Sequence, residues 1–344
     1  MFKEAQCDFC GECLNRCRYI PLAEGSGGTE FEKLVNGEKV DWLHDCITCM
    51  SCDEICPQDA HPFDLILRRL EEDGKFTDPT LVKQMADRFL AKGDPRPVEP
   101  KDRVISLCVM TGNMPWAVQG QLFENENLTV LKGLPYFCNV LFAHMGNASI
   151  MRERVQKQVD NLAASGAKEI VFVHEDCYAM FNSMAPAYGI KVPFRPVHLF
   201  EYLRDYLKEN QDKITKLNMK VAYQRPCASR HTAPEVEGIL NEVLEMIGVE
   251  KVTREYEGIN ALCCGVEIAG PNLKLFPRGK NYEPFRDKNI EDAQKAGAEA
   301  MAYLCPMCFK TLSDKARAVG MKNYMISDLC RLALGEELPA DKPL

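Results

Sequence analysis

Apolar and polar positions follow two different periods along this chain. The runs "VISLC" (104–108) and "KVAYQRPC" (220–227) are strand-like, and each ends at a cysteine. The stretch "ASIMRERVQKQVDNLAASG" (148–166) instead carries its apolar residues at helical spacing, as does "FDLILRRLEE" (63–72). Strands that alternate with helices indicate α/β layers. The later part of the chain is therefore predicted to be α/β, and the helix at 63–72 is predicted to close a separate N-terminal domain.

Two segments of the α/β part resemble each other. Three residues recur 131 positions later without a gap, as Gly166, Cys177 and Gly189 become Gly297, Cys308 and Gly320. Such a match indicates an internal repeat. The stretch "KGDPRPVEPKD" (92–102) contains three prolines and clustered charge, which is typical of a linker. We therefore predict an α+β multidomain protein, with a mostly helical domain followed by two repeated α/β domains, at 1–92, 102–213 and 214–344.

Composition and charge exclude several classes of protein. The 344 residues have a formal net charge of -8, which argues against nucleic acid as a partner. No window approaches the ~18 uninterrupted apolar residues of a membrane span. The N-terminus "MFKEAQCDFC" has no apolar core of a secretory signal. The expectation is a cytoplasmic protein, which could be membrane-associated through a partner subunit.

The seventeen cysteines are the unusual feature of the composition. In a chain without an export signal they do not indicate disulfides, because the cytosol keeps thiols reduced. Most of them fall into spaced groups, and such spacing indicates metal binding. Cys330 has no partner group and is expected to be a core residue.

The two N-terminal groups, "CDFCGECLNRC" and "CITCMSCDEICP", both read C-x2-C-x2-C-x3-C. In this ferredoxin pattern three close thiolates bind one 4Fe–4S cluster and the fourth binds the other. The spacing assigns one cluster to Cys7, Cys10, Cys13 and Cys56, and the second to Cys46, Cys49, Cys52 and Cys17. Structural zinc is the alternative, but zinc sites are built from C-x2-C pairs. The first group departs from the pattern, since Arg18 and not proline follows its last cysteine.

The second α/β half carries five further cysteines: Cys227, Cys263, Cys264, Cys305 and Cys308. Five thiolates exceed the four that a cubane or a tetrahedral zinc ion uses. Adjacent cysteines can bind two different irons of a larger or distorted cluster, and Gly265 would allow the backbone to approach it. The alternative is a set of buried core thiols.

The C…CCG…C-P-x-C pattern resembles the cysteine-rich (CCG) domain of the heterodisulfide reductase family, and the whole chain resembles the fused catalytic subunits of that family. Similar proteins serve sulfur-metabolism membrane complexes and glycolate or lactate oxidation. The resemblance implies a helical ferredoxin domain and a noncubane 4Fe–4S cluster on the five cysteines, which would then be catalytic.

The first α/β half departs from this pattern. Asn139 follows Cys138, and His174 stands at the position of Cys305. The remaining set is three thiols and an imidazole, which suits zinc or a smaller iron–sulfur centre. Its members are Cys108, Cys138, His174 and Cys177. The alternative is a site that has lost its metal.

No P-loop or flavin motif is found, and "GSGGTE" (25–30) is expected to be a loop and no dinucleotide site. Electrons must then come from another redox subunit that contains flavin, haem or iron–sulfur clusters. The resemblance implies an oxidoreductase that acts on a disulfide or thiol substrate. Arg225, Arg230 and His231 could bind this substrate or form a solvated loop. The alternative function is an electron relay within a multi-subunit dehydrogenase complex.

Overall fold

The computed structural model describes residues 1–89, 94–124, 128–232, 235–265, 269–270, 273–274 and 282–339. Helices and parallel sheets are both present, so the predicted α+β class is confirmed. The linker candidate begins in residues that lie outside this description, and 94–102 contains no helix or strand. Among the described residues no helix is both long and apolar enough to cross a membrane.

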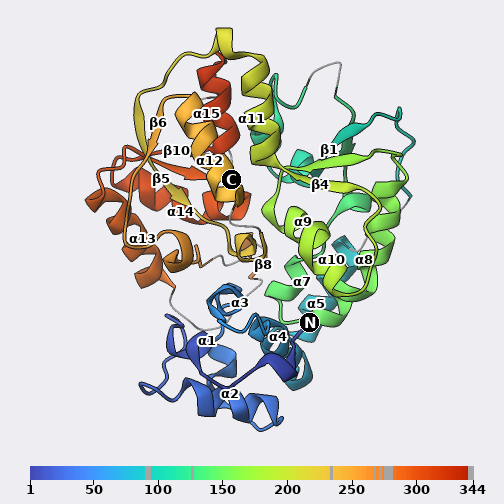
Figure 1. Ribbon diagram of the computed structural model, residues 1–344, viewed down its shortest axis with the longest axis vertical. Coiled ribbons are helices and arrows are strands. Elements are labelled where there is room, and N and C mark those ends of the chain that lie inside the picture. The colour runs from blue at the N-terminus through green and yellow to red at the C-terminus, as the bar shows by residue number, and fades with distance from the viewer. Residues whose placement is uncertain are drawn as a thin grey trace.

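The N-terminal part, 1–89, contains helices and no strand, and it forms the lower end of the molecule in Figure 1. Helix α4 includes the stretch 63–72, and its apolar face packs into a small core with Phe31 and Trp42. The elements are η1 (Glu4–Gln6), α1 (Glu12–Asn15), α2 (Gly27–Val35), η2 (Asp41–Asp45), α3 (Ser51–Ile55), α4 (Pro62–Asp73) and α5 (Pro79–Phe89).

The glycine-rich stretch 25–30 was expected to be a loop, but only Gly25 and Ser26 precede helix α2 and residues 27–30 form its first turn, so that expectation was wrong for most of the stretch. A Cβ atom at Gly28 would collide with the carbonyl oxygen of Phe9, and one at Gly11 would collide with the backbone of Gly28. The first cysteine group therefore packs directly on the start of α2, and only glycine permits this approach. Gly11 and Gly28 allow two backbone segments to pack closely, and this close packing explains why glycine stands at both positions.

The first α/β unit has a sheet of four parallel strands in the order β2-β1-β3-β4. The strands are β1 (Arg103–Cys108), β2 (Val130–Lys132), β3 (Glu169–Phe172) and β4 (Arg195–His198). The helices are α6 (Met110–Asn113), η3 (Pro115–Val118), η4 (Leu134–Tyr136), α7 (Leu141–His144), α8 (Ala148–Ala163), α9 (Glu175–Ala179), the π-helix η5 (Met180–Met184), α10 (Ala185–Ala187), α11 (Leu199–Glu209) and η6 (Gln211–Lys213).

The second α/β unit has a parallel sheet in the order β10-β9-β5-β6. Its strands are β5 (Met219–Gln224), β6 (Val249–Lys251), β9 (Ala300–Tyr303) and β10 (Lys322–Met325). The other elements are η7 (Cys227–His231), α12 (Glu235–Met246), η8 (Gly258–Asn260), the short hairpin β7 (Ala269–Gly270) and β8 (Leu273–Lys274), α13 (Glu283–Lys295), α14 (Pro306–Ala318) and α15 (Ile326–Ala333).

The two sheets have the same strand order. When the four strands of each sheet are numbered along the chain, both sheets read second, first, third, fourth from one edge to the other. Strands β3 and β9 lie 131 residues apart, which is the offset of the sequence repeat. The four strands of each main sheet are parallel, so the loops after them meet at one edge of that sheet. Cys108 ends β1 and Cys227 follows β5, so both lie at such an edge.

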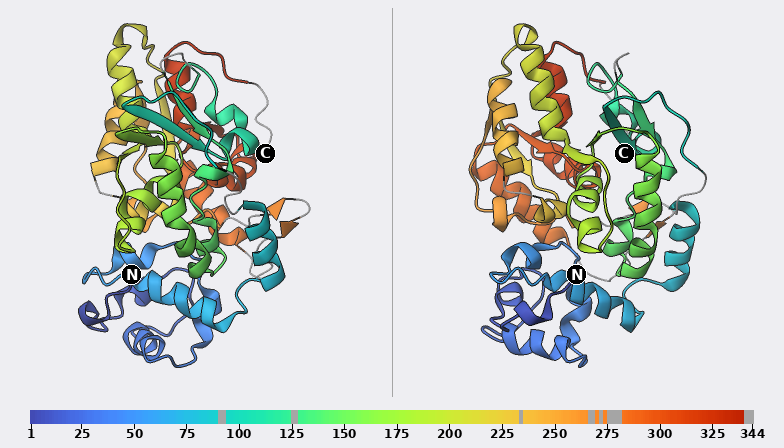
Figure 2. Two further views of the ribbon diagram at one scale, coloured as in Figure 1. Left: turned by 90° about the vertical axis from the view of Figure 1, so that its right-hand side faces the viewer. Right: turned by 45° about the vertical axis from the view of Figure 1, so that its right-hand side comes forward.

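One apolar core joins the two sheets. It contains Val197 of the first sheet, Val221 of the second, and Leu203 of helix α11, which packs on α12 and α15 between them. A second core lies between the first sheet and α8, around Val155 and Phe172. Figure 2 shows the two α/β units side by side with the N-terminal helices across one end of both.

Candidate iron–sulfur centres

The four cysteines assigned to the first N-terminal cluster lie together. Burial raises the pKa of Cys7, Cys10 and Cys13, and the nearby thiol of Cys56 raises all three further. The sequence places Cys56 more than 40 positions away from these residues, at the end of helix α3. The backbone N–H of Ala60 donates a hydrogen bond of 3.4 Å to the sulfur of Cys56.

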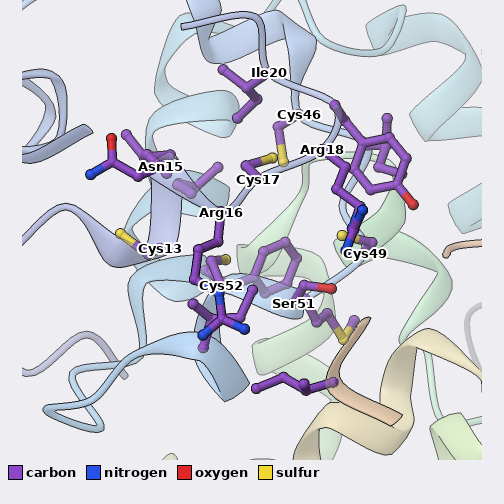
Figure 3. Close-up of a pocket in the computed structure, with 18 of the residues that line it drawn as sticks. Cys13, Asn15, Arg16, Cys17, Arg18, Ile20, Cys46, Cys49, Ser51 and Cys52 are labelled. Atoms are coloured by element: carbon purple, nitrogen blue, oxygen red, sulfur yellow. The ribbon is translucent and has the colours of Figure 1, made fainter. Parts of the chain in front are cut away.

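The cysteines assigned to the second cluster surround a cavity of about 350 Å³. In Figure 3 the side chains of Cys17, Cys46, Cys49 and Cys52 lie around this cavity. Burial and the neighbouring Cys49 raise the pKa of Cys17 to about 11. The N–H of Thr48, whose backbone is left-handed, donates to the sulfur of Cys46 at 3.3 Å.

The five cysteines of the second α/β unit also converge. A hydrogen bond with Cys264 raises the pKa of Cys263 and of Cys308, and burial raises both further. Cys305 hydrogen-bonds to Cys308, which lowers the pKa of Cys305 to about 6. Burial raises the pKa of Cys227, and the charges of Asp176, Cys305 and Cys264 raise it further. The loops after β5 and β9 and the "CCG" segment thus deliver their thiols to one place.

Gly265 makes the "CCG" turn possible. Its φ is +62°, in the left-handed region that favours glycine, and a Cβ there would lie 3.1 Å from the Cβ of Tyr282. Its N–H donates to the sulfur of Cys263 at 3.4 Å. The glycine therefore turns the backbone back toward the thiols that precede it.

The five-cysteine site adjoins the second N-terminal site. The negative charge of Cys49 contributes to the raised pKa of Cys227 and of Cys263. Tyr19, two residues after Cys17, accepts a hydrogen bond of 2.8 Å from the N–H of Cys263. Ala261, which precedes the "CCG" segment, lines the cavity of Figure 3. The segment that precedes the "CCG" cysteines therefore also lines the cavity of the second N-terminal set.

In the first α/β unit the three predicted thiols and the imidazole come together. Cys138, His174 and Cys177 have ligand atoms within 4.8 Å of one another, and Cys177 hydrogen-bonds to Cys108. Burial opposes ionisation of Cys138, but hydrogen bonds with Cys177 and His174 outweigh it and lower its pKa to about 7.

Histidines of the first unit reach the thiols of the second, which the sequence spacing did not reveal. Nε2 of His174 lies 3.6 Å from the sulfur of Cys305, and Nε2 of His144 lies 3.7 Å from that of Cys227. The Nδ1 atom of His144 lies 3.2 Å from Oγ1 of Thr48 in the second cysteine motif. His144 ends the short helix α7, and no local pattern marks it as a site residue.

The two arginines next to Cys227 do not form a solvated loop. Both form ion pairs with Glu54 of the second cysteine motif, Arg225 through Nη1 at 2.8 Å. Arg230 also donates to the carbonyl oxygens of Ile259 and Ala261, at 3.0 and 2.9 Å. These guanidinium groups thus hold the N-terminal part on the loop of Cys227.

The residues fit iron–sulfur clusters in chemistry and in space. Buried thiols that repel one another when ionised have raised pKa values, and a cluster would remove this repulsion by supplying positive iron. The cavity between the second motif and the "CCG" segment is bordered by cysteine sulfur atoms, by apolar side chains such as Phe63 and Ile66, and by the cationic side chains of Arg16 and Arg18. Positive side chains beside the thiols would offset the negative charge of a thiolate-bound cluster.

The comparisons with known proteins agree with this chemistry. The family model for the cysteine-rich domain, CCG, matches residues 221–313. One component of the fumarate reductase (CoM/CoB) of Methanothermobacter marburgensis is 23% identical over 95% of this chain and 71% of its own length. One component of the dihydromethanophenazine:CoB–CoM heterodisulfide reductase of Methanosarcina barkeri is 26% identical over 53% of this chain. The match covers only 44% of that relative.

A solved structure shares the fold. A hypothetical protein from Helicobacter pylori superposes with a TM-score of 0.64 at 12% identity, over 97% of this chain and 72% of that one. At this identity the likeness concerns the fold alone. The CCG match and the two redox proteins point the same way: residues 221–313 match the cysteine-rich CCG domain, and the chain is similar to redox subunits of the heterodisulfide reductase-like family.

Proposed function

We propose that this protein passes electrons through two 4Fe–4S clusters to a noncubane cluster that performs disulfide or thiol redox chemistry. The ligands would be the two N-terminal sets of four cysteines and the five cysteines of the second α/β unit. The observation that carries this proposal is the proximity of the second N-terminal set to the five cysteines: the N–H of Cys263 donates a hydrogen bond of 2.8 Å to Tyr19, and the charge of Cys49 helps to raise the pKa of Cys227 and Cys263. Electron transfer needs neighbouring centres, and the fold brings these two together.

The corresponding domains would be a ferredoxin domain at 1–92, an incomplete cysteine-rich domain at 102–213 and a complete one at 214–344. The shared strand order of the two sheets supports the repeat of the last two. The separate core of the N-terminal helices around Phe31 and Leu70 supports the first.

The cluster, when bound, would supply iron that takes up a thiolate and single electrons. The residues of the chain would hold it and shield it from water. Cys264 is 3% exposed and Cys308 is 2% exposed, so the protein covers one side of the centre. His144 and His174 approach two of the ligand sulfurs from the first α/β unit and would donate N–H hydrogen bonds to them. Such bonds orient ligands and change their basicity.

In the first α/β unit, Cys108, Cys138, His174 and Cys177 would bind zinc or a smaller iron–sulfur centre. Asn139, which replaces the second cysteine of the "CCG" pattern, is fully buried and neither amide atom has a hydrogen-bond partner. A buried polar group of this kind calls for an unseen partner such as a bound ion or water. This supports an occupied site.

A second candidate function is an electron relay without a substrate of its own. Arg225 and Arg230, which could have bound an anionic thiol, are instead engaged by Glu54. Both relatives are named as subunits, so partner proteins with further redox groups are expected, and one of them could attach the protein to a membrane.

The test is metal analysis of anaerobically purified full-length protein. We expect about twelve irons per chain, with acid-labile sulfide to match, and EPR signals of two cubanes and one distinct third centre. About eight irons and no third signal would contradict the noncubane assignment. Turnover of a small disulfide by the reduced protein supports the enzyme, and inertness unless partner proteins are added supports the relay.

A further inference from the structure

A histidine–aspartate–histidine cluster that includes none of the cysteines lies next to the second cysteine motif, where Asp53 directly follows Cys52. It consists of Asp53 in helix α3, His61 just before helix α4, and His231 at the end of η7. Their ligand atoms all lie within 4.8 Å of one another. We propose that these three side chains bind a divalent transition-metal ion, for which zinc is the probe.

The distances fit a metal better than hydrogen bonds. Oδ2 of Asp53 lies 3.7 Å from Nδ1 of His61 and 3.6 Å from Nε2 of His231, beyond hydrogen-bond length. Two ligands bonded to one tetrahedral zinc ion at about 2.0–2.1 Å lie roughly 3.3 Å apart. A shift of a few tenths of an ångström would complete the coordination.

Burial makes a bound cation the best explanation of this arrangement. The side chain of Asp53 is 3% exposed, and both its Oδ2 and the Nε2 of His231 are buried without a hydrogen-bond partner. A buried carboxylate oxygen without a partner is costly. The other oxygen of Asp53 accepts a bond of 2.7 Å from the N–H of Phe63, which fixes the carboxylate and leaves Oδ2 directed at the two rings.

The surrounding groups resemble those of known metal sites. Asp59 lies 3.3 Å from Nε2 of His61 and is itself held by Lys3 at 2.6 Å. A carboxylate on the outer nitrogen keeps the proton there and leaves the Nδ1 lone pair for a metal. The carbonyl oxygen of His231 accepts a bond of 2.8 Å from Ser183, which anchors that residue.

Two histidines and one carboxylate leave coordination positions for water. A cavity of about 40 Å³ borders His61 and His231, and this is enough space for a water molecule. The donor set suits zinc or ferrous iron. Because Asp53 and His61 come from the N-terminal part and His231 follows Cys227, the ion would clamp the N-terminal part to the cysteine loop of the second unit.

The experiment uses full-length protein purified without oxygen and titrated with zinc. We expect one saturable zinc site that His61→Gln and His231→Gln each abolish, with a loss of about one zinc per chain and unchanged cluster EPR signals. The matched control is His44→Gln, since His44 belongs to the same helical part but pairs with Asp73 at 3.0 Å. It should retain full zinc binding.

Zinc X-ray absorption separates this site from the cysteine site of the first unit. Nitrogen and oxygen ligands lie at about 2.0–2.1 Å and sulfur ligands at about 2.3 Å. The spectrum of the wild-type protein minus that of either variant should contain only the shorter distances. Equal zinc binding in all four proteins, or zinc with sulfur ligands alone, would overturn the proposal. None of the three residues belongs to a proposed cluster, so this result is independent of the iron analysis.

Discussion

At the scale of single residues, Cys264 decides what kind of cluster the second unit can hold. It is buried, and its thiol contacts both Cys263 and Cys308. Without it the site is reduced to four cysteines, which is the number that an ordinary cubane uses. The adjacent pair is therefore the feature that makes a five-thiolate centre possible.

We predict that Cys264→Ser abolishes the signal of the third centre and any disulfide turnover, while both cubane signals persist. EPR of the oxidised, thiol-treated protein measures this. Cys330→Ala is the control, because Cys330 is also buried but lies in helix α15 outside every cysteine group. An unchanged spectrum in Cys264→Ser would refute the five-ligand assignment.

His174 belongs to two sites at once. It hydrogen-bonds to Cys138 in the first unit, and its Nε2 lies 3.6 Å from Cys305 in the second. From the sequence alone, its loss would affect only the first site. The structure predicts that His174→Ala lowers the zinc content and melting temperature and also shifts the reduction potential of the five-cysteine centre, because Cys305 loses a donor.

Redox titration followed by EPR tests this prediction, and metal analysis accompanies it. His198→Gln serves as the control, since His198 is a buried histidine of the same unit but pairs with Glu175 at 2.7 Å. Should His174→Ala leave metal content, melting temperature and potential all unchanged, the imidazole has no role in either site.

At the scale of elements, helix α3 connects the N-terminal part to the rest. It packs on η7 and η8, and its Glu54 is 23% exposed between Arg225 and Arg230. The side chains of these arginines are 9% and 4% exposed, so removal of the carboxylate would take this ion pair from the buried Arg230 and leave Arg225 with Glu237 alone. Breaking a buried ion pair costs far more than breaking a surface pair.

Glu54→Gln should therefore lower the free energy of unfolding by about 2–5 kcal/mol and weaken the packing of α3 on η7 and η8. Glu72→Gln removes a carboxylate of α4 that is 51% exposed and should cost at most about 1 kcal/mol. Urea unfolding of both variants measures the difference. Equal effects would show that Glu54 does not hold the interface.

At the scale of the whole molecule, the two α/β units share their core. Leu203 is fully buried in α11, between strands of the first sheet and helices of the second. A cavity at this position would be felt by both sheets, because closely packed interiors relax only partially. The N-terminal helices have their own core, in which Leu70 is fully buried.

Leu203→Ala is expected to cost about 2–5 kcal/mol and to lower hydrogen-exchange protection in β1, β3, β5 and β9 together. Leu70→Ala, a substitution of the same size, should lower protection mainly within residues 1–89. Loss of protection in only one sheet of Leu203→Ala would contradict a shared core.

The sequence by itself determined the local features of this protein. Spacing of three and four residues identifies the N-terminal cysteine motifs, since three of the four cysteines assigned to each cluster come from one short segment. The helical and strand-like periods identify the layers, and the offset of 131 residues identifies the repeat. Gly27 and Gly28 were misinterpreted as part of a loop, because these glycines are required by the backbone of Gly11 and Phe9 that packs against them.

Only the tertiary structure decided what lies between these motifs. His144 reaches Cys227 across 83 positions, Glu54 reaches Arg225 across 171, and Tyr19 reaches Cys263 across 244. No periodicity records such pairs, because each follows from how the edges of two sheets and one helix meet. The same holds for Asp53, His61 and His231, which form a cluster only where η7 rests on α3.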